Sequence, residues 1–526
     1  MLKSFMVFPS AAPRRWFFQP FLLFMVLVDS GSAGNWPQYR GANHDGVSSD
    51  RILQRWEGSV TNALWTISMT NCLGSLAVSE QRVFTQTVRF LEGSAKEVCV
   101  ALDAVTGAEL WARPVDDAIY PHGGVGLDDG PRTTPSVEGG FVFLLTSYLK
   151  LYRLNATNGS IVWQKDLRSL YNATVIAWQN AASPVLEDGL IFLNVNGSTS
   201  NLIAFRTADG SVAWRSDLPA PAQLTHSTPV LATISGVRQL IFATQDGLVA
   251  VNPASGASLW RAEYPFTYGT SIGASPVVWE DMVFICGAHS YGMGATVVQV
   301  TFTNNFWTTR RLWATNNPSS HWMTPVAQDG YLYGQFGIQS SDSPKAQLMC
   351  VDMRTGQVLW STNDFGRGGT LLVNGDLLSL TEKGDLVLAA ANPAGYSQRA
   401  RCRAIPDYNP FTNKCWNVPA ISDGRIYVRS SGKIAAFDFS SALLRIDPPQ
   451  FLSSDTFSMT IRAVDGTSLN SNRPGNIQIR SIADLGTPVS SWPVLTNELL
   501  FSNGVFRMND VKTDGKTQRF FSVAEP

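Results

Sequence analysis

Short apolar runs alternate with polar turns along most of the chain, and one such unit recurs. The unit is an apolar run ending at Asp or Asn, a turn with Gly four residues later, and a second run that carries Trp; residues 101–111 show it in full. The Asp or Asn side chain accepts a backbone N–H two residues on, and Gly adopts the left-handed conformation that closes a hairpin. The pattern predicts a β-hairpin at each copy. Further clear copies are 154–163, 204–214, 251–260 and 351–360.

Tryptophan marks this unit at near-constant intervals. Trp65 and Trp313 fall in register with weaker flanks, so successive copies lie 46 to 53 residues apart. An indole buries about 150 to 250 Å² and is suited to lie flat between neighbouring sheets with its N–H on a backbone acceptor. We expect these side chains to dock one sheet against the next. The series is Trp65, Trp111, Trp163, Trp214, Trp260, Trp313 and Trp360.

Two more strand signals precede each hairpin, usually a Thr-Pro or Ser-Pro start and then an apolar run, as at 134–144. Four antiparallel strands per unit, with no helical segment between units, predict an all-β propeller of four-stranded blades. Seven Trp positions and a degenerate hairpin at 392–395, with Arg401 near the next Trp slot, predict eight blades. The last half unit, 426–438, lacks a Trp strand. The strand of Trp65 can supply it, so that N- and C-terminal strands close one blade.

The remaining segments predict a signal and a second domain. Residues 1–33 carry Lys3, Arg14 and Arg15, a mostly apolar run at 16–28, and then small residues. That run is shorter than the roughly 20 residues of a membrane span, which favours a cleaved signal peptide over an uncleaved anchor. The export route, general secretory or twin-arginine, stays open. We expect the propeller over 34–446 and a small β-sandwich-like module over 447–526, where the repeat gives way to a different strand pattern.

Composition excludes several classes of protein. The chain has 526 residues, of which 44% are hydrophobic and 15% charged, and a formal net charge of −1. A disordered chain does not have this composition. Without a strong positive field, the protein is not expected to bind nucleic acid.

The six cysteines all follow the signal, and disulfides persist in exported proteins. Cys402 and Cys415 close a short polar loop and form the expected disulfide. Cys286 and Cys350 lie in apolar runs and are expected to be buried thiols.

The unit A-x-D-x-x-T-G-x-x-x-W resembles the pyrroloquinoline quinone (PQQ)-like β-propeller repeat over about residues 35–440. That repeat occurs in quinoprotein dehydrogenases and in the scaffold subunit of the bacterial outer-membrane barrel-assembly machinery. Segments 36–48 and 130–135 also look like parts of exported bacterial members. The resemblance implies a propeller fold and a periplasmic or extracellular location.

The family's dehydrogenases stack the quinone between a tryptophan and a disulfide of two adjacent cysteines, and bind calcium through acidic and amide side chains. This chain has no Cys-Cys pair. No carboxylate cluster can be matched residue by residue either, so no catalytic residue is carried over and no metal site is expected.

Polar residues just before the blade starts are the candidates for a ligand site at the channel mouth. Imidazoles and guanidiniums there suit an anionic or quinone-like ligand. The alternative is an ordinary wet channel mouth without a ligand. The candidates are Arg132, Asn180, His226, His321, Arg367 and Lys414.

Together these features predict an exported, non-enzymatic, monomeric binding or scaffold protein without a cofactor. Its expected partner is an envelope or extracellular protein or polymer. The alternative is a PQQ- and calcium-dependent oxidoreductase, similar to an alcohol or sugar dehydrogenase, with its site near His226, His321 and Arg132.

Overall fold

The computed structural model divides the chain into two units. Residues 34–50 and 61–438 form the larger unit, and residues 51–56 and 439–525 belong to the smaller one. The predicted signal at 1–33 lies outside the described residues. The structure describes 34–56, 61–120, 130–197, 202–216, 225–268, 272–287, 294–337, 346–410, 412–464, 466, 469, 477–483, 487–513 and 519–525.

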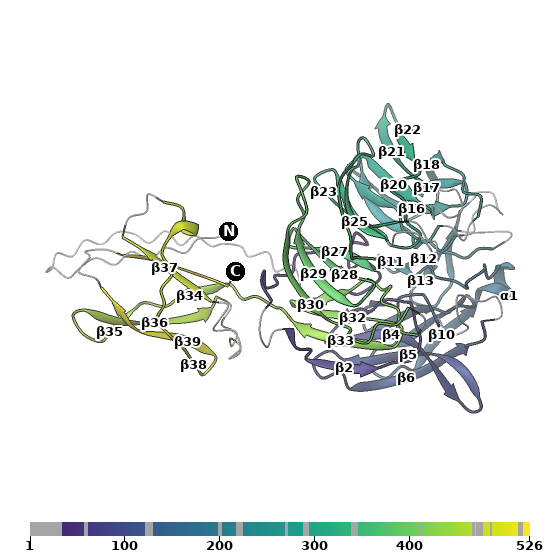
Figure 1. Ribbon diagram of the computed structural model, residues 1–526. Coiled ribbons are helices and arrows are strands. Elements are labelled where there is room, and N and C mark those ends of the chain that lie inside the picture. Colours follow the sequence, from purple (N-terminus) through teal and green to yellow (C-terminus); the bar gives the residue numbers. More distant parts are fainter. Residues whose placement is uncertain are drawn as a thin grey trace, which may run out of the picture. The chain divides into compact units, whose positions relative to one another are not determined.

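The larger unit is built from four-stranded antiparallel sheets, numbered here in chain order (Figure 1). The first six are: sheet 1, β3 (Ala77–Ser79), β4 (Arg82–Leu91), β5 (Ser94–Asp103), β6 (Glu109–Asp117); sheet 2, β7 (Ser136–Glu138), β8 (Phe141–Leu145), β9 (Lys150–Asn155), β10 (Ile161–Asp166); sheet 3, β11 (Val185–Glu187), β12 (Leu190–Asn194), β13 (Leu202–Arg206), β14 (Val212–Arg215); sheet 4, β15 (Val230–Ile234), β16 (Val237–Thr244), β17 (Gly247–Val251), β18 (Ser258–Glu263); sheet 5, β19 (Val277–Trp279), β20 (Met282–Cys286), β21 (Ala295–Thr303), β22 (Phe306–Thr315); sheet 6, β23 (Val326–Gln328), β24 (Tyr331–Phe336), β25 (Gln347–Asp352), β26 (Val358–Thr362).

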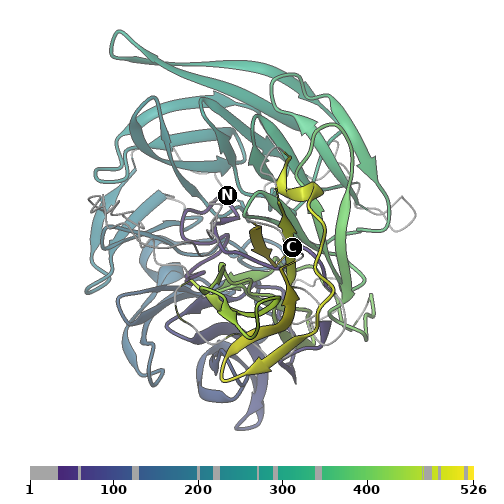
Figure 2. The same cartoon turned by 90° about the vertical axis from the view of Figure 1, so that its left-hand side faces the viewer.

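The last two sheets of the larger unit also recruit strands from near residue 50. Sheet 7 contains β27 (Gly369–Val373), β28 (Asp376–Leu380), β29 (Asp385–Ala390) and β30 (Gln398–Arg403), with β1 (Val47–Ser48) parallel to β27. Sheet 8 contains β31 (Ala420–Ser422), β32 (Arg425–Arg429) and β33 (Lys433–Asp438), completed by β2 (Trp65–Ser68). The strand of Trp65 thus pairs with β33, as the sequence predicts. Figure 2 shows the sheets arranged around a common centre.

One short helix interrupts this strand pattern within the described residues. It is α1 (Leu167–Tyr171), which the Asp166 side chain caps by accepting the N–H groups of Arg168 and Ser169. No helix in the described ranges is long and apolar enough to cross a membrane.

Each repeat tryptophan except Trp260 makes a hydrogen bond from its own sheet to the next. The indole N–H donates to a backbone carbonyl in the hairpin turn of the following sheet. From Trp65 this bond runs from sheet 8 to sheet 1. The bonds are Trp65 to Ala104 (3.2 Å), Trp111 to Ala156 (2.9 Å), Trp163 to Thr207 (3.1 Å), Trp214 to Pro253 (2.7 Å), Trp313 to Met353 (2.7 Å) and Trp360 to Asn392 (2.8 Å).

The glycine of the same turn lies against the indole ring. Gly159 has a φ of +68°, and a Cβ there would lie 2.5 Å from the ring of Trp111. Gly107, Gly256 and Gly356 meet Trp65, Trp214 and Trp313 in the same way. The repeat therefore needs glycine for two reasons, the left-handed backbone and the space for the neighbouring ring.

Trp260 differs because the hairpin that follows it is different. The β21–β22 hairpin turns at Asn304 and Asn305 instead of through a T-G turn. The indole N–H of Trp260 donates to Oε1 of Gln239 in its own sheet, at 2.6 Å. Its ring still packs with Val283 and Ile285 of sheet 5.

Sheet 7 shows which residue takes the register position that tryptophan has in other sheets. In sheets 1 to 6 a register shift adjoins the residue paired with Trp, as between Ala101 and Leu102 opposite Trp111. In sheet 7 this register position is filled by Ala400, directly before Arg401, which the sequence places near it. Arg401 instead donates its Nε to Asp385 at 3.0 Å.

The predicted Cys402–Cys415 disulfide is wrong in this structure. All six cysteines are buried free thiols, which confirms the prediction for Cys286 and Cys350. Cys402 lies on β30 opposite Leu386, whereas Cys415 lies in the segment that leads to sheet 8. Burial raises the pKa of both thiols to about 12, so neither is present as a reactive thiolate near neutral pH.

The segment before β1 crosses the inner strands of several sheets. Trp36 forms a β-bridge with Val78 of sheet 1. Val137 of sheet 2 donates its N–H to Pro37 at 2.8 Å. Arg40 is only 2% exposed and donates to the carbonyls of Thr324 (3.0 Å) and Pro325 (2.8 Å), at the start of sheet 6. The segment therefore ties distant sheets together at the centre of the unit.

The smaller unit contains two sheets that share one core. The first contains β34 (Leu444–Ile446), β35 (Gln450–Phe451), β36 (Thr456–Ala463), β38 (Leu499–Ser502) and β39 (Val505–Lys512); the second pairs β37 (Gln478–Ile482) with β40 (Phe520–Ala524). Met459 and Phe506 of the first sheet and Ile479 and Phe521 of the second belong to the same buried cluster. A 3-10 turn, η5 (Val489–Ser491), completes the described elements.

We predict that Gly159→Ala destabilises the protein more than Gly236→Ala. Both glycines have positive φ values, +68° and +76°, but an added Cβ meets the Trp111 ring only at Gly159. The backbone strain is therefore common to both variants, and the steric overlap should cost Gly159→Ala about 1 to 3 kcal/mol more. Urea unfolding of the two variants measures this difference. Equal losses would contradict the docking role of the Trp111–Gly159 contact.

Candidate functional site

A ring of hydroxyl groups lies at the starts of the inner strands. Between five pairs of neighbouring sheets a backbone N–H donates to a Ser or Thr side chain: Ser75 to Thr134 (3.0 Å), Thr134 to Ser183 (2.9 Å), Ser183 to Thr228 (3.0 Å), Ser275 to Thr324 (3.0 Å) and Val418 to Ser75 (3.0 Å). The last bond joins sheet 8 to sheet 1. The Thr-Pro and Ser-Pro starts seen in the sequence therefore serve as links between sheets.

These strand starts enclose a cavity of about 170 Å³. Ser75, Thr134, Ser183 and Thr228 line it and are called the hydroxyl layer below. Tyr39, from the crossing segment, also belongs to the lining. The cavity is thus built from the same positions in successive sheets, plus one side chain from the N-terminal segment.

A second layer lies two residues before the hydroxyl layer and varies in chemistry from sheet to sheet. By register with the strand starts, its members are Leu73, Arg132, Ala181, His226, Gly273, Trp322, Arg367 and Trp416. All of them except Arg367 line the cavity. We call this set the variable layer.

Three of the six predicted ligand residues come together at the cavity, namely Arg132, His226 and His321. Asn180 is buried beside the cavity, where its amide donates to the carbonyl of Ala182 at 3.2 Å. Arg367 and Lys414 do not line it. Their charged groups lie over the ring of Trp416, at 4.7 and 5.1 Å from its centroid.

The tryptophans of the cavity were missed by the sequence analysis. Trp178, Trp322 and Trp416 all line it, and the rings of Trp322 and Trp416 are 4.8 Å apart. A signal was present, since Trp322 and Trp416 both lie three residues before a proline that starts an inner strand, like Arg132 and His226. They fall outside the Trp repeat and were not weighed as site residues.

Glu382 forms an ion pair with Arg367, the residue whose guanidinium lies over the ring of Trp416. It accepts from Arg367 through Nε at 3.1 Å and Nη2 at 2.8 Å, and it is 2% exposed. Burial alone would raise the pKa of Glu382, but the hydrogen bonds from Arg367 outweigh it and hold this pKa below its usual value. The carboxylate is therefore charged and neutralises Arg367.

His226 is the most unusual polar group of the lining. It is 7% exposed, and neither of its ring nitrogens makes a well-aligned hydrogen bond within the described residues, although the backbone of Ala177 lies close enough to act on its pKa. Burial lowers the pKa of His226 to about 3, and the charges of His321 and Arg132 act in the same direction. The ring is therefore neutral at physiological pH and presents one donor and one acceptor.

Trp178 adds local strain to the lining. Trp178 and the next residue, Gln179, have φ values of +73° and +62°, which non-glycine residues rarely adopt. Nη1 of Arg132 approaches the amide oxygen of Gln179 at 3.4 Å. Two successive strained residues at a cavity are typical of functional sites.

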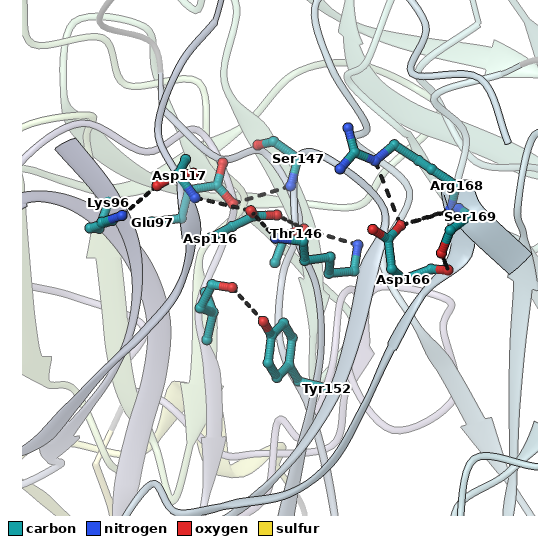
Figure 3. Close-up of polar contacts among 12 residues, drawn as sticks. Lys96, Glu97, Asp116, Asp117, Thr146, Ser147, Tyr152, Asp166, Arg168 and Ser169 are labelled. Carbon is teal, nitrogen blue, oxygen red and sulfur yellow. Dashed lines mark hydrogen bonds and ion pairs between the residues drawn. The ribbon is translucent and has the colours of Figure 1, made fainter. Parts of the chain in front are cut away.

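A separate polar cluster joins sheets 1 and 2 (Figure 3). Glu97 is fully buried and accepts the Tyr120 hydroxyl at 2.8 Å and the Ser147 N–H at 3.2 Å. Asp116 beside it accepts from Thr146 at 2.8 Å and from Lys150 at 2.7 Å. Burial raises the pKa of Glu97 to about 7 despite these hydrogen bonds.

Across the described ranges, no group of three or more His, Cys, Asp or Glu side chains is placed to hold a metal ion.

Glu97 makes stability depend on pH in a defined direction. The pKa of Glu97 is about 7 in the folded protein and 4.5 in the unfolded chain. Its contribution to the free energy of unfolding is therefore fully present below pH 4.5 and is lost as the pH rises through 7. We predict that the free energy of unfolding of Glu97→Gln, minus that of the wild type, rises by about 2 to 3 kcal/mol from pH 5 to pH 8. Urea unfolding at both pH values measures this change. The exposed Glu80→Gln serves as the control, and a pH-independent difference for Glu97→Gln would refute the assignment.

Comparison with known proteins identifies the family. A family model described as outer membrane protein assembly factor BamB matches residues 94–362, slightly more than half of the chain. The BamB of Yersinia pestis is 22% identical over 335 residues, which cover 63% of this chain and 68% of that protein. The BamB of Salmonella typhimurium is 22% identical over 414 residues, covering 77% and 87%.

The fold is also similar to that of a solved structure. The quinohemoprotein alcohol dehydrogenase from Comamonas testosteroni matches with a TM-score of 0.55 at 13% identity, over 80% of this chain and 83% of that one. At this identity the likeness concerns the fold alone. Together with the Trp repeat, the family match shows that the chain belongs to the PQQ-like β-propeller repeat family whose model is described as outer membrane protein assembly factor BamB.

Proposed function

We propose that this protein is an exported, non-enzymatic propeller of eight blades that acts as a binding or scaffold protein in the periplasm or outside the cell. The eight sheets of the larger unit serve as the blades, and the C-terminal unit is a small sandwich-like module. The observation that carries the proposal is the chemistry of the cavity. Its described lining offers indoles, imidazoles, hydroxyls and a guanidinium, and no carboxylate.

Such a lining supports binding more than catalysis. His226 is neutral, but its low pKa makes it a poor general base, since an effective base has a pKa near the working pH. The curated relatives are named as assembly factors of the outer membrane. We extend that role to this chain as a class of function, with an envelope or extracellular protein or polymer as the partner and the protein itself as a monomer.

Two long hairpins offer a surface for a protein partner. The strands of β4–β5 and β21–β22 have nine or ten residues, and their tips carry Phe90 and Phe306, which are 76% and 72% exposed. Both hairpins are labelled in Figure 1. On the β21–β22 hairpin Phe306 has further aromatic neighbours, since Phe302 is 36% exposed and its ring centroid lies 4.6 Å from that of Trp307. A group of exposed apolar side chains of this kind favours an interaction site.

The alternative, a PQQ-dependent oxidoreductase, is supported by the meeting of His226, His321 and Arg132 in one cavity. The lining does not fit PQQ with calcium. Calcium takes oxygen ligands, mainly carboxylates and carbonyls, and the described lining has no carboxylate. PQQ also offers mainly acceptors, which leaves the acceptor nitrogen of His226 unsatisfied. We therefore propose a role without this cofactor.

Addition of PQQ and calcium to the purified protein tests the enzyme alternative. We expect no shift of the PQQ absorbance, no thermal stabilisation and no dye reduction with alcohols or sugars. The measurement is a spectrophotometric titration with a quinoprotein dehydrogenase as positive control. Saturable PQQ binding with substrate-dependent dye reduction would overturn the non-enzymatic role.

The scaffold role predicts that loss of the hairpin aromatics weakens capture of an envelope partner. The double variant Phe90→Ala, Phe306→Ala should recover at least about tenfold less of the partner from cross-linked envelope extract, because a lost anchor costs about 1.4 kcal/mol or more. Leu170→Ala, an exposed position on α1, is the matched control. Equal recovery by wild type and double variant would show that the hairpins are not the contact.

A further inference from the structure

We infer that the central cavity binds a saccharide, with a sugar ring against the indoles and its hydroxyl groups on His226 and the hydroxyl layer. This inference rests on the proposed binding function and names the class of ligand for the same cavity. Three features of the lining carry it: an unsatisfied neutral imidazole, hydroxyl groups with protons left to donate, and a continuous aromatic wall.

His226 sets the first requirement. The backbone of Ala177 lies close to the ring as an acceptor, but the neutral ring also has an acceptor nitrogen without a well-aligned partner in the described residues, so a bound ligand must supply a donor for it. A carboxylate or quinone only accepts, and an apolar aromatic compound does neither. A sugar hydroxyl donates and accepts, so it can donate to this nitrogen.

The hydroxyl layer sets the second requirement. The oxygens of Thr134, Ser183, Thr228 and Ser75 each accept a backbone N–H from a neighbouring sheet. Each hydroxyl therefore keeps its own proton to donate. The indole N–H of Trp322 is likewise without a described partner. A ligand with several oxygen acceptors around its edge matches these donors.

The aromatic wall sets the third requirement. Trp322 and Trp416 touch at an angle of 38°, and Trp178 belongs to the same lining. Arg367 and Lys414 lie over the ring of Trp416 and hold it in place. Flat apolar surfaces of this kind pack against the C–H face of a pyranose ring, while the ring's edge stays available for hydrogen bonds. Few ligand classes other than saccharides combine such a face with such an edge.

Small residues in the variable layer leave room for the ligand. Gly273 and Ala181 occupy positions where other sheets place Arg, His or Trp. A Cβ at Gly273 would lie 2.9 Å from the carbonyl of His321, which accepts the Gly273 N–H at 2.9 Å. The glycine thus lets the loop of His321 approach sheet 5 and shapes the wall next to His226.

The test uses the full chain on a glycan array that covers neutral, acidic and amino sugars. The best saccharide is then titrated by calorimetry and by tryptophan fluorescence. We expect saturable binding with a fluorescence change, and no heat with benzoate, which has an aromatic face and a carboxylate but no hydroxyl. No array spot above background, or equal binding of benzoate, would overturn the inference.

Three variants of buried histidines sharpen the test. His226→Phe keeps a ring but removes donor and acceptor, so affinity should fall at least tenfold. His226→Gln keeps both and should stay within a few-fold of the wild type, which separates recognition from loss of folding. His44→Gln, at the other buried imidazole that lies outside this lining, should leave affinity unchanged. Unchanged binding by His226→Phe would overturn the role of His226.

Failure of this inference and failure of the proposed function give different results. If no saccharide binds while partner capture still depends on Phe90 and Phe306, only the saccharide inference is overturned. If PQQ binds with calcium and dye reduction follows, both are overturned.

Discussion

The structure of the larger unit depends on one contact that repeats around it, a tryptophan ring against a left-handed glycine of the next sheet. Trp111 shows both halves of it, since its N–H reaches the carbonyl of Ala156 and its ring fills the space that a side chain at Gly159 would need. The contact joins neighbouring sheets edge to face, so one sheet's turn fixes the next sheet's position. From Trp65 to Ala104 it links the last sheet to the first.

A second ring of contacts near the centre leaves some positions free to vary. The hydroxyl layer fixes the backbone at the starts of four inner strands through hydrogen bonds between neighbouring sheets, including the bond from Val418 to Ser75. Because the backbone is fixed there, residues two positions earlier can change from leucine to arginine, histidine or tryptophan without altering the strand. The chemistry of the cavity therefore depends on the variable layer, with one residue from each sheet.

The sequence predicts the repeated part of this structure well and the cavity only in part. The spacing of the tryptophans is a direct consequence of their contacts, so the four-stranded sheets and the pairing of β2 with β33 could be inferred from it. Arg132 and His226 lie three residues before the prolines of two Thr-Pro starts, and this spacing correctly predicted that they line the cavity. Trp322 and Trp416 have the same spacing, but only charged and polar residues at this spacing were considered as lining.

Other errors arose where tertiary context outweighs local pattern. Loop length suggested a bond between Cys402 and Cys415, but pairing of β30 with β29 fixes one of them within sheet 7. Trp260 has the sequence of the repeat, yet the next hairpin lacks the usual turn and its N–H pairs with Gln239. Each case depends on a partner that is distant in sequence.

The closed arrangement also explains how an unsatisfied cavity can be tolerated. A buried imidazole whose acceptor nitrogen lacks a hydrogen bond costs about 1 to 3 kcal/mol, and the left-handed pair at Trp178 and Gln179 costs a similar amount for each residue. These costs fall on loops before the inner strands, while the repeated contacts act at the sheets themselves. Because the tryptophan contacts and the hydroxyl layer hold the backbone without help from the variable layer, the variable layer can keep unpaired groups for a ligand. A bound ligand then makes the hydrogen bonds that these groups lack after folding and so offsets their free-energy cost. This favours a cavity for ligand recognition over a wet channel mouth.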